Sequence, residues 1–164
     1  MANSSLELLT IGTELLLGFT LDSNGAEIAR ALGEQGLQVV RRTSVADRAD
    51  DIADAVGGAL ARTGTVLTTG GLGPTRDDIS KRAVARLFEV PLEFDDSVWQ
   101  AVVARFAKLG RVPAESNRVQ AEIPRGATVL PNRWGTAPGI WLEGPPGLVI
   151  MLPGVPYEMR NLLR

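Results

Sequence analysis

The sequence predicts an α/β fold with a mostly parallel, partly mixed sheet. Strand-like and helix-like segments alternate along most of the chain, which is typical of a parallel sheet with crossover helices. Three apolar runs end in glycine-containing turns, as expected for strands whose carboxyl ends meet at one edge of such a sheet. Two further β runs near the end of the chain are close enough to pair as a hairpin, which makes the sheet mixed.

Six segments have the composition of strands, because they are apolar or β-branched and are bounded by glycine, proline or asparagine. In chain order they are residues 6–11, 37–45, 65–69, 128–130, 139–142 and 148–152. The last two flank the turn at residues 144–147 and form the expected hairpin.

The intervening segments carry helical periodicity with start or stop signals. The predicted helices are residues 24–34, 47–62, 77–88, 95–109 and 156–164, with a helical turn or loop at 12–20 and a short helical piece at 115–121. Asn24 and Glu27 form a capping-box pair for the first of them. Ile79, Ala83 and Leu87 form one apolar stripe on the third. The last helix simply stops, as in a fragment of a longer protein.

The composition excludes several classes of active site. The 164 residues include no histidine and no cysteine, so neither a Ser-His-Asp or Cys-His nucleophile nor a Cys/His zinc site can form. A bound metal would need oxygen ligands, which favours magnesium, manganese or calcium. Acid–base chemistry would fall to Asp, Glu, Lys, Tyr157 or metal-bound water.

Length and charge restrict the partners. A chain of 164 residues with 45% hydrophobic residues is expected to be one globular domain over residues 1–164. The net charge of −2 argues against a nucleic-acid partner. No apolar run approaches the ~18 residues of a membrane span, and the first five residues carry no positively charged leader region. We expect a cytoplasmic protein, a homo-oligomer, with a small-molecule ligand.

The most informative segment runs from Val66 to Asp78 and reads V-L-T-T-G-G-L-G-P-T-R-D-D. The glycines of this strand-to-helix turn allow positive φ and close approach of a ligand; they are Gly70, Gly71 and Gly73. Thr75 is expected to cap the following helix, whose first N–H groups would bind an anion. The segment is neither a Walker A loop nor a dinucleotide fingerprint. A plain strand-to-helix turn is the alternative interpretation.

Two acids and a basic group follow the glycines. Asp77 and Asp78 could hold a divalent cation against the bound anion. Arg76, with its basic neighbours, flanks the loop and could assist with phosphate, or could simply belong to an exposed helix face. Thr75 and Asp78 also match a capping box, and the helix dipole favours acids in a first turn. Metal binding and helix capping therefore both explain the acids.

Two other strand ends carry candidate ligand-binding residues. Gly12, Thr13 and Glu14 follow the first strand, so Glu14 is expected at the same sheet edge as Asp77. Gly154 lies in a proline-flanked turn after the last strand, before a helix that contains Glu158. Either turn could be merely structural. Asn117 and Gln120, in a long loop, could read a base or a sugar.

Four segments resemble the N-terminal domain of the CinA (competence/damage-inducible) family, a branch of the MoaB/Mog molybdopterin-binding fold. They are Ile11-Gly-Thr-Glu-Leu-Leu-Leu-Gly18, Thr69-Gly-Gly-Leu-Gly-Pro-Thr-Arg-Asp-Asp78, Gly135-Thr-Ala-Pro-Gly139 and Leu152-Pro-Gly-Val-Pro-Tyr-Glu-Met159. The resemblance covers nearly the whole chain and implies a three-layer α/β/α fold.

The resemblance also implies a site. In the family this domain is linked to metal-dependent cleavage of ADP-ribose to AMP and ribose 5-phosphate, whereas MoaB/Mog relatives bind or adenylylate molybdopterin. Carried over by position, the glycines and Thr75 would cradle phosphate, Asp77 and Asp78 would hold metal, and Glu14, Asn24 and Asn117 would line the pocket. The family usually has asparagine where this chain has Asp22, so the chain departs from the family pattern at this position.

Two functions follow as hypotheses. The first is a metal-dependent pyrophosphatase that acts on a nucleotide sugar such as ADP-ribose, with Asp77 and Asp78 as catalytic residues and magnesium or a similar ion as cofactor. The alternative is a molybdopterin-binding module without hydrolytic activity. Many family members continue into an amidase-like domain, and a full-length form of this protein could do so too.

Overall fold

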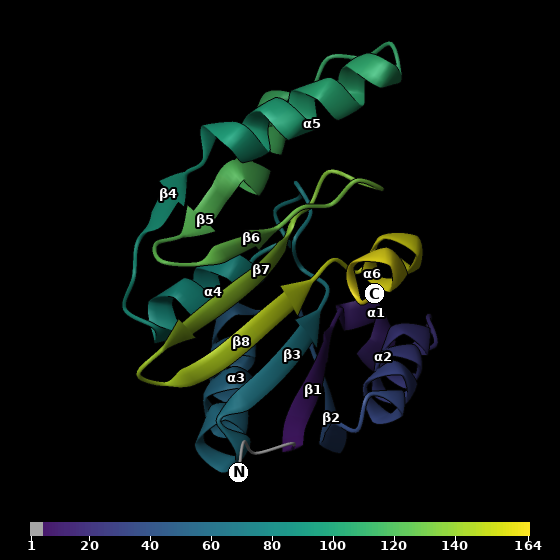
Figure 1. Cartoon of the computed structure of the whole chain (residues 1–164), viewed down its shortest axis with the longest axis vertical. Coiled ribbons are helices and arrows are strands. Elements are labelled where there is room, and N and C mark those ends of the chain that lie inside the picture. The colour runs from purple at the N-terminus through teal and green to yellow at the C-terminus, as the bar shows by residue number, and fades with distance from the viewer. Residues whose placement is uncertain (1–4) are drawn as a thin grey trace.

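The computed structural model describes residues 5–164 and has a six-stranded sheet in the order β2-β1-β3-β8-β7-β6 (Figure 1). Its strands are β1 (Ser5–Ile11), β2 (Gln38–Val45), β3 (Thr65–Thr69), β6 (Thr128–Leu130), β7 (Gly139–Gly144) and β8 (Gly147–Leu152). The first four strands in that order are mutually parallel, whereas β7 is antiparallel to both of its neighbours. The mixed sheet and its β7–β8 hairpin are confirmed. Residues 1–4, which include most of the segment judged to lack a leader, lie outside the described residues.

Helices cover both faces of the sheet and make three layers (Figure 1). They are α1 (Thr13–Leu16), α2 (Ser23–Glu34), α3 (Ala49–Thr63), α4 (Ser80–Leu87), α5 (Asp96–Lys108), the 3-10 helix η1 (Glu115–Ala121) and α6 (Pro156–Leu162). One face packs against α3 and α4, and the other against α2 and α6. The predicted three-layer α/β/α fold is confirmed. Across residues 5–164, no helix has the length and apolar character needed to span a bilayer.

The central strand β1 is buried on both faces because parallel sheets carry helices on both sides. Leu8 packs in the cluster formed with α2 and α6, whereas Leu9 packs in the cluster formed with α3 and α4. Full burial of one such side chain contributes about 1.5–3 kcal/mol.

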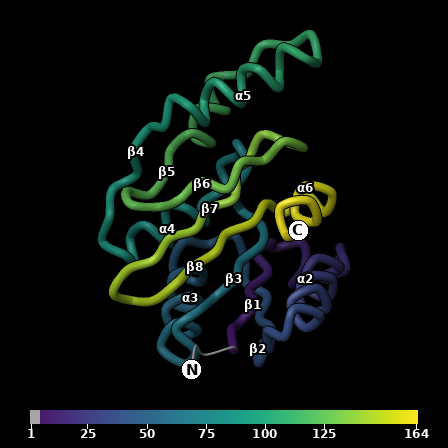
Figure 2. The backbone as a smooth tube through the Cα atoms, in the orientation of Figure 1, coloured from purple at the N-terminus to yellow at the C-terminus, as the bar shows by residue number. Residues whose placement is uncertain are grey.

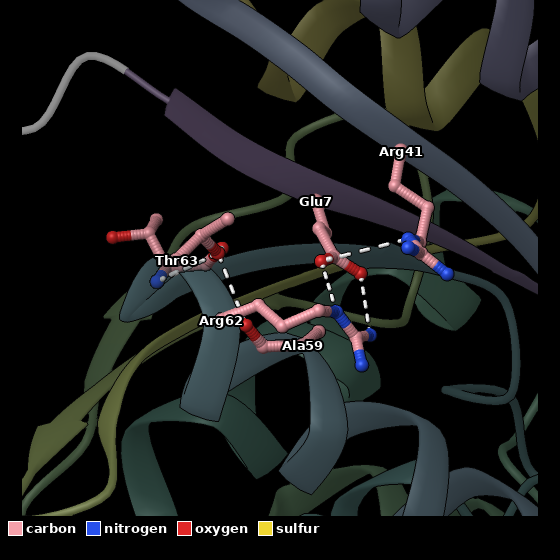
Figure 3. Close-up of polar contacts among 6 residues, drawn as sticks. Glu7, Arg41, Ala59, Arg62 and Thr63 are labelled. Carbon is pink, nitrogen blue, oxygen red and sulfur yellow. Dashed lines mark hydrogen bonds and ion pairs between the residues drawn. The ribbon is translucent and has the colours of Figure 1, made fainter.

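Glu7 is the one acid inside this strand, and it is 1% exposed. Figure 3 shows its carboxylate between the guanidinium groups of Arg62 and Arg41. Its carboxylate accepts two hydrogen bonds from Arg62 of α3, at 2.6 and 2.8 Å, and lies 3.9 Å from Arg41 of β2. The hydrogen bond from Arg62 and the charges of both arginines hold the pKa of Glu7 below its usual value, against the effect of burial. The pair therefore ties α3 to the sheet.

A small lobe lies beside the main sheet. The strands β4 (Leu92–Phe94) and β5 (Glu122–Pro124) form an antiparallel pair next to α5 and η1. These two strands were not predicted, because each has three residues and a proline stands at or beside each of them. The Arg118 guanidinium stacks on Phe94 and Trp99, which joins η1 to the lobe.

Two helix starts differ from the predicted ones. Asp22, not Asn24, caps α2, since the Asp22 carboxylate accepts a hydrogen bond from the Gly25 N–H at 2.8 Å. The helix predicted over residues 77–88 begins only at Ser80, so Thr75 does not cap it. Asp78 instead accepts hydrogen bonds from both the N–H and the hydroxyl of Thr75, at 2.7 and 2.6 Å. The capping-box pair closes a turn before the helix.

Candidate functional site

A cavity of about 370 Å³ opens where β1, β3 and β8 end. We name it the edge cavity, and the polar and glycine residues that line it include Gly12, Glu14, Asp47, Gly70, Gly71, Gly73, Asp78, Gln120, Thr136, Gly154 and Glu158. These residues come from six separate parts of the chain. The parallel strands bring them together because their carboxyl ends share one edge of the sheet.

The glycine turn after β3 is tightly fitted. Gly70 has φ of 107° and Gly71 has φ of 69°, which only glycine adopts readily. A Cβ on Gly70 would overlap the Ile11 carbonyl oxygen, and one on Gly71 would overlap the Ser80 hydroxyl. The Ser80 hydroxyl donates to the Gly70 carbonyl at 3.0 Å, and the Ser80 N–H donates to the Gly71 carbonyl at 3.2 Å. These two hydrogen bonds of Ser80 therefore fix the glycine turn against the start of α4.

The N–H groups that are available to an anion in this turn are not the predicted ones at the start of the following helix. The N–H groups of Asp78, Ile79 and Ser80 are all hydrogen-bonded inside the loop. Within the described part of the chain, by contrast, no hydrogen bond is donated by the N–H groups of residues 71–73, which line the edge cavity. Successive free N–H groups next to a positive-φ glycine form a concave anion site. The glycine turn itself therefore supplies the donors.

Four acids and no arginine or lysine line the edge cavity. Asp47 accepts hydrogen bonds from the N–H and the hydroxyl of Thr13, at 2.7 and 3.1 Å, and Asp78 is bonded to Thr75. Glu14 is exposed, and Glu158 is half-buried. Such a cavity repels a phosphate unless a cation lies between them. Within residues 5–164, no group of three or more acidic side chains could hold a metal ion by itself.

Glu158 has the most perturbed environment of the four acids. Its carboxylate accepts a hydrogen bond from Asn132 Nδ2 at 2.5 Å and lies against Gly135, where any Cβ would overlap it. Burial raises the pKa of Glu158, while the Asn132 hydrogen bond and the charge of Arg105 act in the opposite direction. A carboxyl with a raised pKa at a cavity wall is a candidate for proton transfer.

A smaller cavity of about 150 Å³ adjoins the first and shares Ile11, Glu14 and Gly154 with it. Asn24 lines it and donates hydrogen bonds to the Thr69 hydroxyl at 3.2 Å and the Gly154 carbonyl at 2.8 Å. The Asn24 amide oxygen is buried and has no hydrogen-bond partner among the described residues. Asn24 therefore links the ends of β3 and β8 from its place in α2.

Most predicted site residues lie around these cavities, but five do not line either of them: Thr75, Arg76, Asp77, Asn117 and Thr13. The first three are exposed in the turn before α4. Of the two adjacent acids, only Asp78 faces the edge cavity. Asn117 is buried and hydrogen-bonded to the Ala114 N–H and to Gln120, so it supports Gln120, which does line the cavity. Thr13 contacts the site through Asp47.

The sequence matches the family model described as a probable molybdopterin binding domain over residues 7–164. The chain belongs to this family. It is 51% identical, over 96% of its length, to a CinA-like protein of Gemmatimonas aurantiaca, and 44% identical, over 99% of its length, to one of Synechococcus sp. strain CC9902. It covers 37% and 39% of these two proteins, respectively, so it spans well under half of their length.

Solved structures agree with this family membership. The protein CinA from Thermoplasma acidophilum aligns over 99% of this chain and 95% of its own, with 34% identity and a TM-score of 0.87. The molybdopterin biosynthesis enzyme MoaB from Thermus thermophilus aligns over 97% of this chain and 86% of its own, with 19% identity and a TM-score of 0.62. At that identity, the likeness to MoaB shows the fold alone.

Three polar side chains of the edge cavity were not predicted as site residues: Asp47, Thr136 and Glu158. Asp47 follows β2 and Glu158 follows β8, so the rule that selected Glu14 after β1 would have found both. Thr136 comes from a loop beyond β6, inside the segment Gly135-Thr-Ala-Pro-Gly139 that resembles the CinA family, so that segment was the available signal.

Proposed function

We propose that this chain binds a phosphorylated pterin of the molybdopterin type in the edge cavity. The observation that carries the proposal is the row of free N–H groups at residues 71–73, in a chain of the molybdopterin-binding family. These donors suit the phosphate of such a ligand. Gln120 and Thr136 also line the cavity, and the Gln120 amide donates a hydrogen bond to the Thr136 hydroxyl at 2.9 Å. The amide and the hydroxyl suit polar atoms of a ring.

The acids of the cavity imply that a divalent cation accompanies the phosphate. Carboxylates, an amide and a hydroxyl are the oxygen donors that magnesium accepts, and magnesium is usually held by one or two carboxylates plus ligand phosphates. Asp78 and Glu14 would hold such an ion, which would neutralise the phosphate against the acidic wall. The affinity for the ligand should therefore fall when the metal is removed.

A second candidate function is metal-dependent hydrolysis of a nucleotide sugar such as ADP-ribose. It is favoured by one observation, the half-buried Glu158 carboxyl with its raised pKa at the cavity wall. The reaction would add water across the P–O–P linkage of ADP-ribose and give AMP and ribose 5-phosphate. Glu158 would accept the proton of the attacking water.

One experiment separates the two functions. The purified chain is incubated with ADP-ribose or with molybdopterin, with magnesium or with EDTA, and both binding and AMP release are measured. For the binding module we expect magnesium-dependent binding of molybdopterin, while ADP-ribose stays intact. AMP that appears with magnesium and not with EDTA would instead establish the hydrolase.

The matched pair Asp78→Asn and Asp77→Asn tests the cavity itself. Asp78 lines the edge cavity and Asp77 is exposed outside it, although the two residues are adjacent and the substitutions are isosteric. Asp78→Asn should lower metal-dependent affinity by about tenfold or more, and Asp77→Asn should leave it nearly unchanged. Equal effects of the two substitutions would refute this placement of the metal.

A further inference from the structure

A third cavity, of about 460 Å³, lies on the other side of the 131–138 loop, between this loop and α5. We name it the α5 cavity, and the residues used below are Val98, Val102, Arg105, Lys108, Val129 and Arg133. Figure 2 shows the loop as the light green segment that runs between α5 and α6. The α5 cavity shares only Thr136 with the edge cavity, so the loop is a thin wall between them.

The walls of this cavity combine an apolar floor with a basic rim. Val98 and Val102 of α5 and Val129 of β6 form apolar surface, and Val98 and Val102 are buried. Arg105, Lys108 and Arg133 are the charged residues of the lining, which contains no acid. An apolar body with a few converging polar groups, in a volume of some hundreds of Å³, is typical of a small-molecule site.

The three cations of the rim form no ion pair within residues 5–164, although the charge of Arg105 acts on the Glu158 carboxyl of the edge cavity. Nine other arginines form ion pairs, but in the described part of the chain Arg105, Lys108 and Arg133 have no carboxylate within ion-pair distance. Arg105 is held in place by neutral carbonyls, with Nη2 at 2.8 Å from the Trp134 oxygen and Nη1 at 3.5 Å from the Arg133 oxygen. Its guanidinium is thus preorganised by uncharged partners.

We propose that the α5 cavity is a binding site for a small organic anion, with an aromatic or acyl body on the valine floor and its anionic group at Arg105, Lys108 and Arg133. The complementary charge supplies orientation and the apolar floor supplies burial. This site differs from the edge cavity in the sign of its charge, and it needs no metal to accept an anion. It does not depend on the function proposed for the edge cavity.

The test uses two fluorescent probes that differ in one group. Anilinonaphthalene sulfonate has an aromatic body and an anionic group, and phenylnaphthylamine has a similar body without charge. We expect one sulfonate probe to bind per chain, about tenfold or more tighter than the neutral probe. The double variant Lys108→Glu/Arg133→Glu should weaken the sulfonate probe by about tenfold or more and leave the neutral probe unchanged, because both substituted side chains are exposed.

Two controls make the test decisive. The matched double variant Arg30→Glu/Arg164→Glu changes the net charge equally at exposed residues away from the cavity, and it should bind the sulfonate probe normally. Ala101→Trp, at an exposed lining residue, should block both probes. Equal losses in the two double variants, or normal binding in Ala101→Trp, would overturn the proposal. Asp78→Asn should bind the sulfonate probe normally, which separates this site from the edge cavity.

Discussion

At the scale of single residues, the edge cavity depends on side chains that are held by neighbours from distant parts of the chain. Glu158 is positioned by Asn132, which is 26 residues away in sequence, and fits only because residue 135 is glycine. Asn24 is positioned by Gly154, which is 130 residues away. These contacts explain why local patterns identified the turns of the site more readily than its acids.

The raised pKa of Glu158 leads to the first prediction. The folded protein holds this proton up to a higher pH than the unfolded chain does, so the proton stabilises the fold at pH values below the unfolded pKa. This contribution is lost as the pH rises through the folded pKa. Glu158→Gln mimics the protonated form and keeps the hydrogen bond from Asn132, so at about pH 7.5 it should melt at a higher temperature than the parent.

The measurement is a series of thermal melts of both proteins between about pH 4 and pH 8. The difference in melting temperature between Glu158→Gln and the parent should become smaller toward low pH, where Glu158 of the parent is protonated as well. A variant that melts at a lower temperature at the upper end of this range would show that Glu158 is stabilised as the ion.

The second prediction contrasts two glycines of the turn after β3. Gly70→Ala places a Cβ against the backbone oxygen of Ile11 at positive φ, which is rigid and strained, so it should cost about 2 kcal/mol or more of unfolding free energy. Gly73→Ala meets the carboxylate of Asp78, a side chain that can move, at 2.6 Å. Urea unfolding should therefore show the smaller loss for Gly73→Ala, while its ligand affinity falls because Asp78 is displaced.

At the scale of elements, the helix predicted over residues 77–88 shows where sequence reasoning reached its limit. The apolar stripe from Ile79 to Leu87 is real, but the capping-box residues close a separate turn. Thr75 and Asp78 make the same local hydrogen bonds in either geometry, so the sequence could not distinguish them. The tertiary bonds of Ser80 to the glycine turn decide where α4 begins.

Lys81 joins two elements and gives the third prediction. This residue of α4 is 5% exposed, and its ammonium donates to the Val119 carbonyl of η1 at 2.5 Å. Burial lowers the pKa of Lys81 to about 8, although Glu122 and Asp78 oppose the shift. The unfolded chain keeps this proton until about pH 10.4, so the unfolded state binds more protons between these values. The free energy of unfolding should rise with pH in this window, by up to about 3 kcal/mol.

The comparison of urea unfolding for the parent and Lys81→Met between about pH 7.5 and 10.5 isolates this residue. The methionine keeps a buried apolar side chain and has no proton to lose. The increase in unfolding free energy with pH should therefore disappear in this variant. An equal rise in Lys81→Met would assign the effect to other groups.

At the scale of the whole molecule, the sequence was sufficient to predict the α/β layers and the sheet edge where the candidate site lies. The long apolar strands and the glycine turns carry that information locally. The lobe of β4 and β5 was missed because its strands owe their pairing to contacts that are 28 to 32 residues apart. The α5 cavity was missed for the same reason, since Arg105 and Arg133 meet only through the fold.

The last prediction concerns how acid affects the whole fold through Glu7. The lowered pKa of this carboxyl means that the bidentate bond to Arg62 stabilises the protein above the unfolded pKa of about 4.3 and is lost as the pH falls through the folded pKa. Arg62→Met leaves the buried carboxylate of Glu7 with only the 3.9 Å contact to Arg41, which should destabilise the protein at pH 7. Protonation of Glu7 would then relieve the cost, so this variant should recover stability, relative to the parent, on acidification.

The control is Arg41→Met, which removes only the 3.9 Å contact. Its free energy of unfolding in urea should change with pH as that of the parent does, from about pH 7 to pH 3. Parallel curves for all three proteins would show that the pair does not control the acid stability.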